Sequence, residues 1–155
     1  MTQEEKELLL KDLCARLPYR LKVNETVQGD FTLIGVVNDR VLTDCDEEYK
    51  HNNFPAEIIR PYLRPMSSMT EEEILELYKR LGFYYLFSPD NVTEEWRIFK
   101  DAIKNNGLFL PYGIWNDDLE KGIDWLNKNM FDYRGLIPKG IALEAKEGMY
   151  KFELL

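Results

Sequence analysis

The residues best placed to do chemistry are the single histidine, His51, and the acidic stretch at residues 44–48 (DCDEE) just before it. Carboxylates and an imidazole can bind a divalent cation, and an imidazole can act as a general base. A calcium loop, however, needs ligands at alternating positions and a turn glycine, and a zinc site needs more His or Cys. We therefore predict a solvated acidic loop here, with no metal ion, no cofactor and no catalytic residue.

Other reactions need residue combinations that the sequence does not contain. It has no glycine-rich phosphate loop, no nucleophile elbow and no zinc-ligand spacing. A Ser-His or Cys-His mechanism would have to use His51, which follows a polar stretch and precedes two asparagines. Carboxylates are numerous, so a small hydrolase with clustered carboxylates is kept as an alternative. An enzyme is nevertheless the less favoured class.

The composition is that of a globular protein. The 155 residues are 45% hydrophobic and 13% aromatic, and a chain of this length buries roughly 70% of its unfolded surface. This predicts a single compact domain over residues 1–155. The formal net charge of −8 disfavours binding to nucleic acid or to an anionic membrane, because neutralising phosphates requires clustered Lys and Arg.

The sequence also predicts a cytoplasmic protein. Residues 8–10 (LLL) follow three glutamates, without the basic region or apolar core of a signal peptide. No stretch approaches the ~20 apolar residues of a membrane span. The two cysteines, Cys14 and Cys45, are not in a Cys-x-x-Cys pair, which favours free thiols in a reducing compartment.

The first half of the chain has the pattern of one helix followed by a small sheet. Thr2 and Glu5 match a capping box, and leucines at 9, 13 and 17 recur at helical spacing before Pro18. Residues 21–24, 31–37 and 41–43 then alternate or are rich in β-branched side chains, with turn residues between them. We expect three to four short antiparallel strands that lean on the helix or curl into a small SH3-like barrel.

Residues 60–70 (RPYLRPMSSMT) predict a stiff, extended connector that joins neither the sheet nor the helices. Its apolar side chains would clamp it between the β region at 1–59 and the helical half at 71–155. In that half, Thr70 with Glu73 and Thr93 with two glutamates begin helices, and residues 116–130 form a third. The fold class is therefore α+β, with one or two short strands among the later helices.

Several stretches resemble one group of proteins. Residues 60–73 (RPYLRPMSSMTEEE) and 131–145 (FDYRGLIPKGIALEA) are similar to segments of small proteins encoded in prophages and mobile elements of gut Bacteroidales. The resemblance implies a genetic context and brings no activity. Members of the group tend to carry histidines just before the second stretch, where this chain has Asn129 and Met130, and a proline at the position of Lys146. A metal role is therefore not expected there.

The leading functional hypothesis is a non-enzymatic accessory protein of a phage or mobile element that binds a host or phage protein. The alternatives are an acidic mimic of nucleic acid that inhibits a DNA-binding host enzyme, and the small hydrolase. A homo-oligomer is left open. Interfaces favour Tyr, Trp and Arg anchors, and the alternative role for the arginine at 134 is an internal one, to hold carbonyls of the tail or a carboxylate. The predicted binding residues are Tyr62, Arg64, Trp115, Asp132, Tyr133 and Arg134.

Overall fold

The chain folds as an α+β protein in a computed structural model that describes residues 1–45, 52–83, 93–110 and 114–151. It divides into two compact units. Unit 1 comprises Met1–Leu63 and Arg134–Tyr150, and unit 2 comprises Arg64–Tyr133 and Lys151–Leu155. The division falls within the predicted connector, and the tail segment, residues 134–150, belongs with the N-terminal part of the chain.

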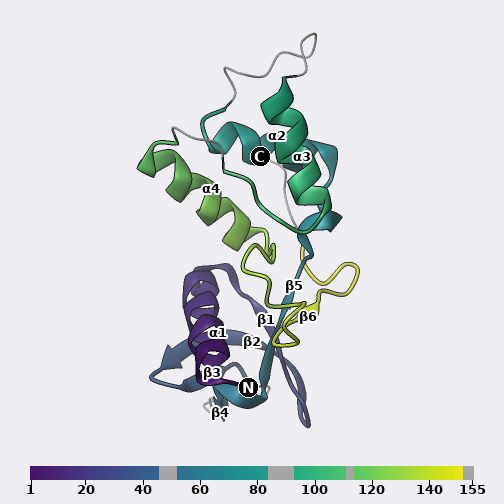
Figure 1. The fold of residues 1–155 in the computed structure, drawn as a ribbon. Coiled ribbons are helices and arrows are strands. Elements are labelled where there is room, and N and C mark those ends of the chain that lie inside the picture. The colour runs from purple at the N-terminus through teal and green to yellow at the C-terminus, as the bar shows by residue number, and fades with distance from the viewer. Residues whose placement is uncertain (46–51, 84–92, 111–113, 152–155) are drawn as a thin grey trace. The chain divides into compact units, whose positions relative to one another are not determined.

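Unit 1 is built on a mixed six-stranded sheet with the strand order β4-β3-β2-β1-β5-β6 (Figure 1). All neighbouring strands are antiparallel except β5 and β6, which are parallel. The predicted antiparallel sheet of three to four strands was therefore too small. The strands are β1 (Lys22–Glu25), β2 (Gly29–Val37), β3 (Arg40–Thr43), β4 (Asn52–Pro55), β5 (Ile59–Leu63) and β6 (Leu143–Glu144).

The sequence did not predict β5. Its proline indicated a connector outside the sheet. In the structure Pro61 lies opposite Val23 of β1. A proline fits in a strand where its nitrogen needs no partner, and on the other side of β5 the pairing with β6 begins only at Tyr62. The first part of the connector is thus a strand, and the prediction that it joins no regular element was wrong.

Helix α1 (Gln3–Arg16) packs against this sheet, as Figure 1 shows. Its predicted capping box is confirmed: the Thr2 hydroxyl accepts from the Glu5 N–H, and the Glu5 carboxylate accepts from the Thr2 N–H. Leu9 and Leu13 are completely buried, so the predicted leucine stripe faces the core of unit 1. A 3₁₀ turn, Leu17–Tyr19, follows the helix.

Unit 2 is helical in its described part and contains α2 (Glu71–Arg80), α3 (Glu94–Lys104) and α4 (Asn116–Lys128) (Figure 1). Thr70 and Thr93 cap α2 and α3 with their side chains, as predicted. The core is aromatic: the Tyr78 ring lies 5.0 Å from the rings of both Trp96 and Phe99. The aromatic run at residues 83–87 (FYYLF) is one of the short strands that the sequence predicts among the later helices, and apart from Phe83 it falls outside the described residues.

Helices α2 and α4 contact each other at Gly122, where a larger residue is excluded. A Cβ atom at this position would overlap Leu81 Cδ2 and lie 2.9 Å from Leu81 Cγ, and Leu81 is itself buried. We expect Gly122→Ala to lower the free energy of unfolding by about 1–3 kcal/mol through overpacking. In a Leu81→Ala background the same change should become neutral or stabilising, because alanine has the higher helix propensity. Chemical denaturation of the four proteins measures this coupling, and additive effects would contradict the packing argument.

Candidate functional site

Five of the six predicted binding residues take part in contacts inside their own unit. Tyr62 is 95% buried, and its hydroxyl donates to Asp30 Oδ1 at 2.9 Å. Hydrogen bonds from Asn24, Tyr62 and Lys146, the first being the strongest, hold the pKa of Asp30 below its ordinary value. Tyr62 therefore helps to fix the turn end of β2 and the tail segment.

In unit 2, Arg64 forms a bidentate ion pair through Nη2 with Glu73, at 2.9 and 3.0 Å, and its guanidinium lies 4.1 Å from the centre of the Phe131 ring. The buried Asp132 donates its backbone N–H to the Arg64 carbonyl. Tyr133 donates its hydroxyl to Asn127 Oδ1 at 3.1 Å. These residues join the end of α4 to the segment that precedes α2.

Arg134 takes the alternative role that the sequence suggested for it, an ion pair with a carboxylate. Its Nη1 donates to Asp12 Oδ1 at 2.7 Å. The same carboxylate accepts two bonds from Arg16, from Nε at 2.8 Å and Nη2 at 2.9 Å, and the side chains of Asp12 and Arg16 are completely buried. This cluster anchors the start of the tail segment to α1.

Trp115 is the predicted binding residue whose side chain is mainly exposed, at 77%. It occupies the N-cap position of α4 with φ −72° and ψ 144° and makes no side-chain capping bond. The other three α-helices of the described chain begin with Thr2, Thr70 and Thr93, at nearly the same backbone angles, and each threonine caps its helix. At Trp115 the chain therefore has capping geometry without a capping side chain.

The segment before α4 displays further apolar side chains. Leu108 and Ile114 pack against the core of unit 2, whereas Phe109 and Leu110 are 40% and 41% exposed. We use the name Trp115 surface for the exposed apolar residues of this segment of the chain, Phe109, Leu110 and Trp115. Sequence reasoning named only the tryptophan, because an apolar run at 108–115 indicates a buried strand or a loop equally well.

The Trp115 surface is followed directly by negative charge. Asp117 and Asp118 lie in the first turn of α4, and Glu120 is exposed in the next. Carboxylates at a helix N-terminus are stabilised by the helix dipole. Lys121 approaches Asp118 at 3.8 Å, and its side chain is 67% exposed, so it screens this charge weakly. A partner that covers Trp115 would meet an apolar contact with acidic residues beside it.

Within the described residues, no group of three or more His, Cys, Asp or Glu could hold a metal ion. The acidic stretch with His51 falls outside the described residues from 46 onward. Cys14 and Cys45 are free thiols in the structure. None of the described helices is long and apolar enough to span a membrane.

Tyr150 fastens the end of the tail segment to unit 1. Its hydroxyl accepts the Lys22 N–H at 3.0 Å and donates to the Tyr62 carbonyl at 2.9 Å. Burial raises the pKa of the Tyr150 phenol above its ordinary value of 10.0, although the Lys22 N–H acts in the opposite direction. The stabilising contribution of the neutral phenol is therefore complete below about pH 10, and it is lost as the pH rises through the folded-state pKa.

We expect Tyr150→Phe to lower the free energy of unfolding by about 1–3 kcal/mol at pH 8, because the Lys22 N–H and the Tyr62 carbonyl lose their partner. The difference from the wild type should shrink above pH 10, since phenylalanine does not ionise. Urea unfolding at several pH values between 8 and 11 measures it. A difference that stays constant with pH would contradict the role of the phenol.

A comparison with protein-family models, with curated proteins and with solved structures gives no match. The function is therefore argued from the geometry of the described residues.

Proposed function

We propose that this chain is a protein-binding accessory protein whose main anchor is the Trp115 surface. The partner is a protein with an apolar pocket that receives the indole and with basic residues beside that pocket. The observation that carries the proposal is the placement of Trp115. A tryptophan at an N-cap gives up a hydrogen bond worth about 1 kcal/mol, and at 77% exposure it recovers little by burial. A residue that makes its own local structure less stable is typical of a binding site, where function and stability compete.

The charge and the residue type agree with this interpretation. Tryptophan is among the side chains most often found as interface hot spots, and neighbouring apolar residues help to exclude water around it. Phe109 and Leu110 are exposed apolar residues that precede Trp115 in the chain. Asp117 and Glu120, both exposed, would steer a basic partner and make association depend on salt.

The resemblance to prophage and mobile-element proteins suggests the setting. In it, the chain would act in the host cytoplasm on a host or phage protein. The strand order supports an SH3-like barrel in unit 1: β2 pairs with β1 along its first part and with β3 along its second, with an irregularity between Leu33 and Gly35. A 3₁₀ turn, Ala56–Ile58, joins β4 to β5, and β5 pairs with β1. The proposed function does not depend on this likeness.

Acidic mimicry of nucleic acid is a weaker candidate. Such a mimic needs unpaired carboxylates spaced like phosphates on one face. In unit 2, described carboxylates are often paired: Glu76 with Arg80 at 2.7 Å, and Glu71 with Lys100 at 2.6 Å. The acidic first turns of α2, α3 and α4 are each balanced by a basic last turn. This pattern stabilises helices and needs no nucleic-acid groove to explain it.

The experiment places a photo-crosslinking amino acid at position 110 and identifies the captured protein by mass spectrometry. The affinity of the purified partner is then measured for the wild type, Trp115→Thr and Val27→Thr. Val27 is 88% exposed in unit 1 and serves as the matched control. Loss of the indole should weaken binding at least about 30-fold, and the control should bind as the wild type does.

Equal affinity of Trp115→Thr and the wild type would overturn the proposal. So would a captured protein that binds through a nucleic-acid groove and is displaced by DNA, because that result identifies the mimic. A partner whose affinity falls with rising salt and with loss of Trp115 supports it.

A further inference from the structure

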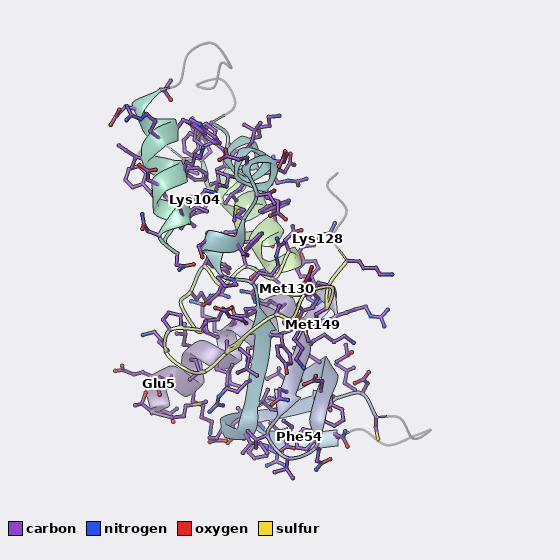
Figure 2. All side chains as sticks on the ribbon, turned by 90° about the vertical axis from the view of Figure 1, so that its right-hand side faces the viewer. Glu5, Phe54, Lys104, Lys128, Met130 and Met149 are labelled. Carbon is purple, nitrogen blue, oxygen red and sulfur yellow. The ribbon has the colours of Figure 1, made fainter. Side chains whose placement is uncertain are left out.

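A second candidate site lies in unit 1, whereas the residues that carry the proposed function belong to unit 2. It is an open hollow of about 330 Å³ lined by Lys22, Asp30, Phe31, Thr32, Asp44 and Met149. Ligand pockets of small molecules begin at about this size. Met149 comes from the tail segment (Figure 2), and the other lining residues come from β1, β2 and the end of β3.

Two opposite charges of this hollow are both hydrogen-bonded to one buried residue, Thr32. Thr32, which is 7% exposed, accepts a hydrogen bond from Lys22 Nζ at its hydroxyl oxygen, at 2.6 Å. Its backbone N–H donates to Asp44 Oδ1, also at 2.6 Å. The ammonium group and the carboxylate are therefore both fixed to Thr32.

Lys22 and Asp44 do not neutralise each other. The ion pairs of the described residues include none between these two side chains, so their charged atoms lie more than 4.0 Å apart. The other carboxylate of the hollow, Asp30, is already paired with Lys146 at 3.1 Å. The hollow thus presents one separated positive charge and one separated negative charge, and its other lining residues include Phe31 and Met149.

We propose that this hollow binds a free α-amino acid with an apolar side chain. The ligand carboxylate would accept from Lys22 Nζ and from the Thr32 hydroxyl, and the ligand ammonium would donate to Asp44. An apolar side chain would contact Phe31 and Met149. A zwitterion is favoured because it satisfies both separated charges, whereas a simple anion would face Asp44 and a simple cation would face Lys22.

The test is a titration of ¹⁵N-labelled protein with L-leucine, followed by NMR. The amide signals of residues 22, 31, 32, 44 and 149 should shift with a dissociation constant on the order of 1 mM, which is ordinary for a ligand of this size. N-acetyl-L-leucine, which lacks the ammonium, and L-leucinamide, which lacks the carboxylate, should each bind at least ten times more weakly.

Variants identify the site. Asp44→Asn and Lys22→Gln should each weaken L-leucine binding at least tenfold, and the controls Glu147→Gln and Lys139→Gln, at exposed positions of the tail segment, should leave it unchanged. The absence of shifts up to 20 times the expected constant would overturn the proposal. Equal binding of leucine and its two derivatives would also overturn it, and that result does not depend on the folding of any variant. Neither outcome bears on the Trp115 surface.

Discussion

Asp12→Ala is expected to lower the free energy of unfolding by about 3–5 kcal/mol. This is the largest stability effect predicted for a substitution in unit 1. The Asp12 carboxylate accepts two hydrogen bonds from Arg16 and one from Arg134. Asp12 and Arg16 have completely buried side chains. Removing one partner of a buried ion pair leaves the desolvation cost of the other charge uncompensated, and this loss is typically of that size.

Denaturant unfolding of the variant measures the loss, with Glu4→Ala as the control. Glu4 lies on the same helix, is exposed, and makes no side-chain hydrogen bond or ion pair with the described residues, so its removal should cost less than about 1 kcal/mol. Asp12→Asn keeps the shape and should give an intermediate loss. If Asp12→Ala and Glu4→Ala have the same stability, the cluster does not stabilise unit 1.

Glu73→Ala should lower the free energy of unfolding by about 2–4 kcal/mol, because this glutamate has two structural roles in unit 2. Its Oε2 accepts the Thr70 N–H at 2.9 Å, which completes the capping box of α2. Both of its oxygens also accept from Arg64. The Glu73 side chain is 7% exposed and that of Arg64 is 17% exposed, so the pair is screened far less than a surface ion pair.

The matched control is Glu71→Ala in the first turn of the same helix. Its ion pair with Lys100 is short, at 2.6 Å, but the two side chains are 57% and 34% exposed, so its loss should cost less than about 1 kcal/mol. Thermal and denaturant unfolding of both variants make the comparison. If Glu73→Ala and Glu71→Ala are equally stable, the ion pair between Arg64 and Glu73 does not contribute to the stability of unit 2.

The features that the sequence predicts well are those whose causes are local. The capping boxes at Thr2 and Thr70 were predicted from residues three positions apart, and both are present. Strand β5 was missed because its place in the sheet depends on β1, about 35 residues earlier in the chain, and proline signals point locally toward a connector. Strand β6 lies in residues 141–145, whose sequence fits a last short turn as well as a strand, and it also gains its place by pairing with β5.

The predicted binding residues also show that contacts between residues far apart in the sequence could not be predicted. Arg134 and Asp12 are 122 positions apart, and Tyr62 and Asp30 are 32 apart. No spacing rule predicts that such pairs meet. From the sequence alone, a Tyr or Arg side chain that binds a partner could therefore not be distinguished from one that makes a contact inside the fold. Trp115 differs because the structure shows its conflict: it occupies the N-cap position of α4, and its side chain makes no capping hydrogen bond. The sequence alone predicted that this helix begins at Asn116, which is itself a good capping residue.

The central claim is that Trp115 serves binding and lowers the stability of the fold. Urea unfolding of Trp115→Thr, compared with the wild type, tests this claim most directly. Threonine at 115 can accept from the Asp118 N–H, as Thr70 does from Glu73 at the start of α2. We predict that the variant is more stable by about 0.5–2 kcal/mol, the value of a helix cap. A variant less stable than the wild type would contradict the account, because it would show that the indole supports the fold.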